Sequence, residues 1–131
     1  MRFFIFFIWI TLPVYSLAEE LEGLWVWEKN SDSHTFSIRI ENGDNGLTGY
    51  YCAVGASGRR IDCSPKKHAH TFPIDLDGSE FEFTTSYSSK TGTAALTMVG
   101  DKLYWVIKSQ PKGEHYAPKS ATLFKYQSHN K

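Results

Sequence analysis

The sequence predicts an all-β protein: eight or nine antiparallel strands in one up-and-down barrel, with one disulfide, after an N-terminal signal peptide. Three observations support this prediction. Apolar and polar residues alternate along most of the chain, turn pairs such as Asn-Gly and Asp-Gly separate the alternating stretches, and no stretch beyond residue 18 has a helical period. A two-sheet sandwich is the alternative, but most of the predicted connections are tight hairpins, which favour a barrel.

Residues 1–18 have the composition of a signal peptide. Arg2 gives the positive start, residues 3–14 are almost wholly apolar, and Ala18 ends a Ser-Leu-Ala cleavage pattern. The apolar run, about a dozen residues, is shorter than the roughly 20 that span a bilayer, so we expect cleavage rather than an uncleaved anchor. The expected mature protein is residues 19–131, a single soluble domain in the periplasm or outside the cell.

The charge balance excludes some classes of partner. The whole chain has 14 basic and 14 acidic residues, and cleavage would remove one of the basic residues. Nucleic acid and anionic membranes both need a clustered basic surface. We therefore expect no nucleic-acid partner, and no membrane association after cleavage.

The alternating pattern places the strands. We expect them at residues 23–28, 35–41, 47–54, 59–63, 71–76, 80–87, 93–99, 102–108 and 120–126. In the second of these stretches Phe36, Ile38 and Ile40 share one face, and in the sixth Phe81, Phe83 and Tyr87 do so. The two longer connections, residues 64–70 and 109–119, are candidate functional loops at the barrel mouths.

The only two cysteines lie on facing arms of one predicted hairpin. Cys52 belongs to the strand before the Gly55–Gly58 turn, and Cys63 ends the strand after it. An exported protein folds where thiols are oxidised, so the two cysteines are expected to form a disulfide. Closing this short loop would contribute about 2–3 kcal/mol to stability.

Two segments resemble lipocalins and avidins. Gly-Leu-Trp at residues 23–25 matches the Gly-x-Trp at the start of the first strand in these families, and residues 35–55 are similar to the second and third strands of avidins. The match covers about the first third of the mature chain. The resemblance implies an eight-stranded barrel with a ligand cavity at one end.

The same comparison argues against biotin as the ligand. Tyr51 matches the ligand-binding tyrosine of avidins, but Trp27 stands where that family has a polar residue for the ureido group, and Ala53 replaces a serine. The second half of the chain has only Trp105 where avidins have several tryptophans around the ligand. The resemblance therefore implies an architecture, and architecture does not imply function.

Aromatic residues suggest a cavity for a small apolar or aromatic ligand. The candidate ligand-binding residues are Trp25, Trp27, Tyr51, Phe83 and Trp105. The alternative is that these side chains fill the barrel, because the interior of an eight-stranded barrel is only wide enough to be filled by side chains.

Metal binding and catalysis have little support in the sequence. His68 and His70 alternate next to two lysines and are weak candidates for metal ligands, since no third ligand stands at a defined spacing. No nucleophile elbow occurs, no carboxylate pair has supporting context, and Glu114 and His115 have no supporting motif. We therefore expect a protein that is not an enzyme and has no cofactor.

A binding function with another protein fits the remaining features. Arg59 and Arg60 lie beside the hairpin turn, and His115 and Tyr116 lie in the loop between Pro111 and Pro118. Arginine and tyrosine are enriched at protein interfaces. The sequence thus predicts an exported inhibitor or immunity type of protein that uses loops at one barrel end, with a lipocalin-like carrier as the alternative.

Overall fold

The computed structural model describes residues 8, 10, 20–44, 46–63, 71–86 and 88–127. The described chain is all-β apart from short turns. Its strands are β1 (Gly23–Trp27), β2 (Thr35–Gly43), β3 (Gly46–Gly55), β4 (Arg60–Cys63), β5 (Phe72–Pro73), β6 (Asp77–Thr84), β7 (Thr91–Val99), β8 (Lys102–Ser109) and β9 (Ser120–Lys125). A single 3-10 turn, η1 (Ala56–Gly58), connects β3 to β4.

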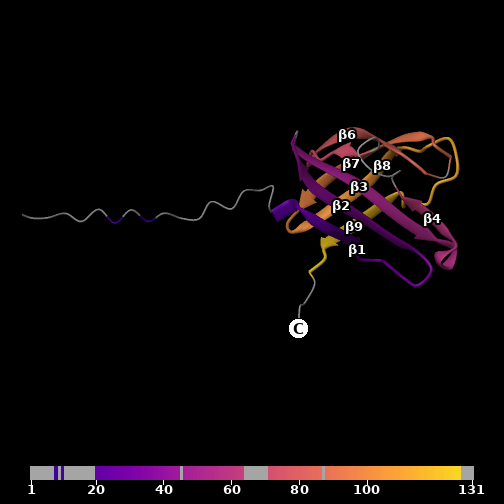
Figure 1. Cartoon of the computed structure of the whole chain (residues 1–131), viewed down its shortest axis with the longest axis horizontal. Helices are drawn as coiled ribbons and strands as arrows, with labels where there is room; N and C mark the ends of the chain where they lie inside the picture. Colours follow the sequence, from indigo (N-terminus) through magenta and orange to yellow (C-terminus); the bar gives the residue numbers. More distant parts are fainter. Residues whose placement is uncertain are drawn as a thin grey trace, which may run out of the picture.

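All strands belong to one curled antiparallel sheet (Figure 1). The order of hydrogen-bonded neighbours is β4-β3-β2-β1-β9-β8-β7-β6, and β5 pairs with β3 beside β4. The last strand returns to pair with the first, with Val26 opposite Phe124, so that two four-stranded meanders join into one sheet. The expected all-β antiparallel fold is confirmed as this half-barrel, and so is the Cys52–Cys63 disulfide.

Two of the expected strands have the wrong extent. The strand expected at residues 71–76 is reduced to β5, although beyond it the Ile74 N–H still donates to the Leu47 carbonyl at 3.0 Å. The strand expected at 80–87 begins at Asp77 and ends at Thr84. Asp77-Gly78, expected as a turn, instead begins β6 with a bulge, which Gly78 accommodates with a φ of 85°. Tyr87 lies outside the described residues.

The concave side of the sheet is filled by aromatic side chains around Trp105. This indole is fully buried, and the ring centroids of Phe36 and Phe83 each lie 5.3 Å from its own. Further rings contact it at 6.0–6.2 Å, from Tyr51, Phe72 and Phe81. The alternation expected from the sequence produces this arrangement, because every second residue of a strand points to the same face.

The connections between strands divide between two ends of the sheet (Figure 1). We call one the loop end: it consists of residues 28–34, 56–59, 85–86 with 88–90, and 110–119. We call the other the turn end: it consists of residues 20–22, 44, 100–101 and 126–127. At the turn end Leu21 is buried, and its carbonyl accepts a hydrogen bond from the indole N–H of Trp25 at 2.9 Å.

Candidate functional site

A buried carboxylate, that of Asp62, lies beneath the loop end. The register of β3 and β4 places Cys52 opposite Cys63 and therefore Ala53 opposite Asp62. Because Ala53 points into the interior, Asp62 does so as well, and its exposed fraction is 0%. An aspartate buried in this way is stable only when hydrogen-bond donors surround it.

Four donor groups from three segments surround this carboxylate. Its Oδ1 accepts hydrogen bonds from the Tyr51 hydroxyl at 3.0 Å, and from the Ser86 backbone N–H and hydroxyl at 3.1 and 3.3 Å. Its Oδ2 accepts the backbone N–H of Tyr116 at 2.9 Å. Asp62 therefore connects β3, Ser86 after β6 and the 110–119 loop.

The Tyr51 hydroxyl is held in its protonated form. Burial raises the pKa of Tyr51 well above its ordinary value, and the nearby Asp62 carboxylate raises it further. The phenol therefore stays a hydrogen-bond donor at every physiological pH. Hydrogen bonds to an ionised acceptor are stronger than those between neutral groups, which favours a fixed geometry at this centre.

Hydrogen bonds also join the loops of the loop end directly to one another. The backbone N–H of Ser57, in η1, donates to the carbonyl of Ser33 at 3.2 Å. His34 Nε2 lies 3.0 Å from the Tyr116 carbonyl, which places a proton on that nitrogen. In Figure 1 these loops gather at the right-hand end of the sheet. Segments distant in sequence are thus joined into one surface.

The Tyr116 side chain packs against Gly55 at the end of β3. A Cβ added at Gly55 would come within 2.7 Å of Tyr116 Cδ1, so only glycine allows this close approach. The Tyr116 hydroxyl donates to Glu114 Oε1 at 2.6 Å. Nearby, the rings of Trp27 and His34 meet edge to face, with centroids 5.4 Å apart. Half-buried aromatic rings therefore form part of the loop-end surface.

The tip of the β3–β4 connection has an unusual backbone. Ala56 and Ser57 have φ values of 51° and 56°, the left-handed region that residues other than glycine rarely adopt. Such conformations persist only where surrounding contacts hold them, and they cluster at functional sites. The Ser57–Ser33 hydrogen bond is one of the contacts that hold this tip.

The structure brings the expected partner-binding residues to the loop end. Arg59 and Arg60 are exposed beside η1, and Tyr116 packs against the strand that leads into it. His115 lies in the same loop as Tyr116, and its Nε2 is 2.6 Å from Gln110 Oε1.

The expected ligand-binding residues do not lie together around an open space. Tyr51, Phe83 and Trp105 are packed against one another, each with an exposed fraction of 1% or less. Trp25 is buried at the turn end, and Trp27 is half-buried at the loop end. The Trp105 indole also donates to the Pro118 carbonyl at 2.9 Å, so it holds the 110–119 loop as well as the core.

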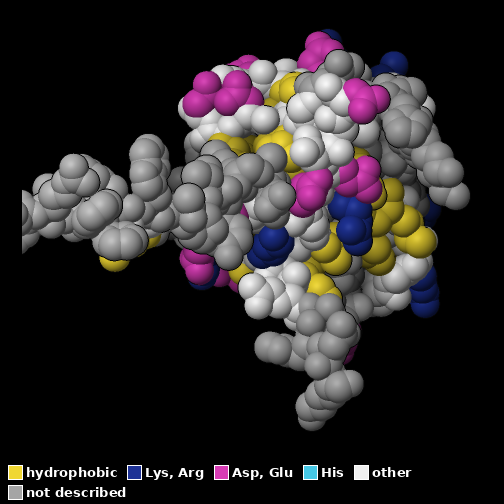
Figure 2. Space-filling model, turned by 60° about the vertical axis from the view of Figure 1, so that its left-hand side comes forward, with side chains coloured by type: hydrophobic (Ala, Val, Ile, Leu, Met, Phe, Trp, Pro, Cys, Tyr) yellow, Lys and Arg dark blue, Asp and Glu magenta, His cyan; other side chains and the backbone are white. Residues whose placement is uncertain are grey.

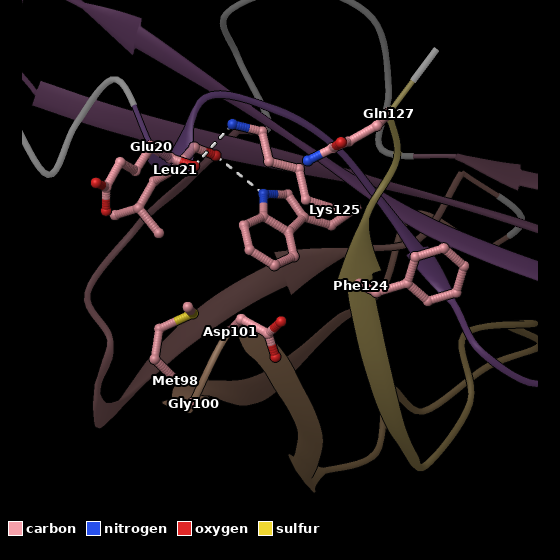
Figure 3. A pocket seen from close by; sticks show the side chains of 9 residues that line it. Glu20, Leu21, Met98, Gly100, Asp101, Phe124, Lys125 and Gln127 are labelled. Carbon is pink, nitrogen blue, oxygen red and sulfur yellow. Dashed lines mark hydrogen bonds between the residues drawn. The ribbon is translucent and has the colours of Figure 1, made fainter. Parts of the chain in front are cut away.

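A pocket of about 410 Å³ lies at the turn end (Figure 3). Of the expected ligand-binding residues it contains Trp25 alone. Its lining combines polar and apolar residues, and consists of Glu20, Leu21, Trp25, Met98, Gly100, Asp101, Phe124, Lys125 and Gln127. Lys125 Nζ donates to the Glu20 carbonyl at 2.8 Å across it. Figure 2 turns this side towards the viewer and shows hydrophobic side chains exposed between acidic and basic ones.

Neither a metal-binding group nor a membrane-spanning helix occurs among the described residues. They contain no group of three or more His, Cys, Asp or Glu side chains arranged to hold a metal ion. None of their helical segments has the length and apolar character of a membrane span. The weak metal candidates, His68 and His70, lie outside the described residues.

No protein-family model, curated protein or solved structure matches the chain. The resemblance to lipocalins and avidins therefore rests on the quoted segments, together with a curled all-β sheet that is compatible with a barrel.

The central residue of the loop end, Asp62, was not among the expected site residues. A signal for it is present in the sequence, because pairing Cys52 with Cys63 sets Asp62 opposite Ala53. Ala53 alternates with Tyr51 and so belongs to the interior face. Aspartate is depleted in strands, and an aspartate predicted to point inward needs donors from elsewhere in the fold. Those donors, in Ser86 and Tyr116, come from loops that a strand pattern cannot position.

Proposed function

We propose that the protein is an exported, non-catalytic binding protein of the lipocalin-like or avidin-like barrel type. Its loop end would recognise another protein, as inhibitors and immunity proteins do. The observation that carries the proposal is the set of hydrogen bonds around Asp62, which joins loops distant in sequence into one surface.

A pre-formed surface favours protein recognition for a physical reason. Binding through mobile loops costs free energy, because each loop and side chain must be ordered. The loop end avoids part of this cost, since contacts such as Ser57–Ser33 and His34–Tyr116 already exist in the unbound chain. It also presents arginine at position 59 and aromatic rings at 27 and 116, the residue types enriched at binding hot spots.

The packing of the interior supports the loops, rather than the concave face, as the binding site. Rings around Trp105 have centroid separations of 5.3–6.2 Å, which are the distances of direct aromatic contact. A ligand at this position would have to displace packed side chains. Export is supported by the disulfide, which is typical of oxidising compartments, and by the signal-like residues 1–18.

A capture experiment with variants at both ends tests the proposal. The full chain, with its own leader and a C-terminal tag, would be produced in its native host and cross-linked in the intact cell envelope. We expect a specific protein to be captured by the wild type and by the turn-end control Asp101→Lys. Capture should be lost with Arg59→Glu, which reverses an exposed charge at the loop end. Equal capture by all three would contradict a loop-end interface.

The purified partner then allows a quantitative measurement. Truncation of a central aromatic residue at an interface often costs about 2 kcal/mol or more, so Tyr116→Ala should weaken binding by roughly 30-fold or more. Titration calorimetry would measure this loss. The same measurement on Asp101→Lys should give the wild-type dissociation constant within about twofold.

The turn-end pocket supports carriage of a small apolar or aromatic ligand as a second candidate function. Its volume of about 410 Å³ is within the range of ligand sites, which begins at about 300 Å³. Native mass spectrometry of the protein purified from its host would detect a retained ligand. A carrier should lose this ligand when Trp25→Ala or Phe124→Ala opens the pocket, and should keep it when Arg59→Glu changes the loop end.

A further inference from the structure

We infer that the Cys52–Cys63 disulfide is a redox latch for the loop end. In the oxidised protein it fixes Asp62, and through Asp62 it fixes the loops; when the bond is reduced, the loops are released while the rest of the sheet stays folded. The consequence for partner binding rests on the proposed function. The effect of reduction on the loops themselves does not depend on the proposed function.

Apart from the hydrogen bonds of Asp62, few apolar contacts hold β4 to the sheet. This strand has four residues and, within the described chain, pairs only with β3. Two of its residues, Arg60 and Ile61, are exposed, so little apolar burial holds the strand in place. The disulfide joins the residues that face each other at the end of the ladder, Cys52 and Cys63. This covalent bond supplies an attachment that a short edge strand does not supply by itself.

Asp62 lies next to Cys63 in the chain, so a movement of Cys63 also moves Asp62. A buried carboxylate is stable only while its donors surround it, and water competes for it as soon as β4 moves. Release of Cys63 gives β4 this freedom. The carboxylate can then turn to solvent and leave the Tyr51 hydroxyl and the backbone N–H groups of Ser86 and Tyr116 without their shared acceptor.

The other side of the sheet contrasts with β4. Strands β7, β8 and β9 are held by longer ladders, for example between Leu103 and Leu123, and these two residues are fully buried. Trp105 lies on β8, and its ring contacts with Phe81 and Phe83 of β6 do not involve β4. Reduction should therefore have a local effect, confined to β4 and the loops that bond to Asp62.

The redox chemistry balances with a thiol reductant. A dithiol attacks the disulfide through a thiolate, passes through a mixed disulfide, and becomes a disulfide itself while Cys52 and Cys63 gain two electrons and two protons. Both cysteines are half-buried rather than fully buried, so a small thiol can approach them. In a reducing compartment the latch is open, and it closes only after oxidation. The loop end would then become competent for binding only after export.

Amide hydrogen exchange tests the latch without any partner. The full chain would be compared in its oxidised form and after reduction by dithiothreitol, with mass analysis to verify both thiols. On reduction, the amides of Ser86 and Tyr116 should exchange about 10- to 100-fold faster, because each loses a charged acceptor. The amides of Leu96 and Leu103 should change by less than about twofold.

A variant that keeps the disulfide tests whether its effect on the loops passes through Asp62. Asp62→Asn has one carbonyl oxygen and one NH₂ group, so at least one of its neighbouring N–H donors meets another donor. The Tyr116 or Ser86 amide should exchange faster in this variant although Cys52–Cys63 remains oxidised. If reduction accelerates the loop amides while Asp62→Asn leaves them unchanged, the route through Asp62 is wrong.

Two other results of the exchange experiment would contradict the latch. The latch is overturned if the loop amides keep their protection in the reduced protein. It is equally overturned if Leu96 and Leu103 lose protection together with the loops, since the disulfide would then stabilise the whole fold. If the loop amides respond as expected but no partner is captured by the oxidised chain, the latch stands and the proposed function fails.

Discussion

The Oδ2 atom of Asp62 accepts the backbone N–H of Tyr116 at 2.9 Å, although the two residues are 54 positions apart. This bond places the 110–119 loop, which has no strand of its own. The Trp105 indole holds the same loop from below through the Pro118 carbonyl. The loop is therefore fixed both from the short edge strand β4 and from the core, and substitutions at either point have distinct expected effects.

Substitution of Asp62 by alanine should destabilise the protein strongly. The change removes the carboxylate that accepts hydrogen bonds from Tyr51, Ser86 and Tyr116. Buried donors without an acceptor cost about 1–3 kcal/mol each, so we expect a loss of about 3 kcal/mol or more in the free energy of unfolding. Urea unfolding followed by tryptophan fluorescence would measure it. Asp101→Ala, at an exposed turn, is the control and should change stability by less than about 0.5 kcal/mol.

Substitution of Gly55 by alanine should displace the Tyr116 ring. Gly55 has an extended backbone, with φ of −128°, so alanine brings no backbone strain, but its Cβ would lie 2.7 Å from Tyr116 Cδ1. We expect a loss of about 1–3 kcal/mol, as for other overpacked sites, and faster exchange of the Tyr116 amide. The matched control is Gly43→Ala, whose nearest contact would be 3.7 Å away. Equal effects of both substitutions would contradict the packing of Tyr116 on Gly55.

Much of the fold could be predicted from the sequence because it depends on local patterns. Alternation placed Phe36, Ile38 and Ile40 on the buried face of β2, and the observed burial confirms it. The errors at β5 and β6 arise where pairing partners decide the extent of a strand: β5 pairs with Thr48 and Gly49 of β3, and Thr97 extends the other ladder back to Asp77. Residue patterns contain no information about such partners.

The candidate site was predictable only in part for the same reason. Arg59 and Tyr116 were selected by residue type and loop position, and the structure places both at the loop end. The hydrogen bonds that join the loops involve backbone groups, such as the Ser57 N–H and the Tyr116 carbonyl. Every residue has these groups, so no sequence pattern distinguishes those that meet. Asp62 was detectable only through the register that the disulfide fixes.

Substitution of Trp105 by phenylalanine should affect the core and the 110–119 loop together. Phenylalanine keeps an aromatic ring but leaves a cavity and removes the donor to the Pro118 carbonyl. We expect a loss of about 2 kcal/mol in the free energy of unfolding, with faster exchange of the loop amides. Tyr104→Phe, on the neighbouring position but 38% exposed, should be close to neutral. Loss of stability without any change in the loop amides would contradict the role of the indole N–H.

Substitution of Tyr51 by phenylalanine should have a pH-dependent effect with a defined sign. The folded chain raises the pKa of Tyr51 above its unfolded value of about 10, first through burial and then through the Asp62 carboxylate. Below about pH 10 the phenol is protonated in both states, and its hydrogen bond to Asp62 should contribute about 1.5–3 kcal/mol. Tyr51→Phe should therefore be less stable than the wild type by this amount at about pH 8.

Above about pH 10 the unfolded chain loses the Tyr51 proton while the folded chain retains it, so this contribution falls as the pH rises. The slope can reach about 1.4 kcal/mol per pH unit, and Tyr51→Phe lacks it. The difference in unfolding free energy between the two proteins should thus narrow between about pH 10 and pH 11. Urea unfolding at several pH values would measure this, because the other titrating groups cancel in the difference. A gap that stays constant over this range would mean that Tyr51 ionises as readily in the folded chain as in the unfolded one, contrary to its burial beside Asp62.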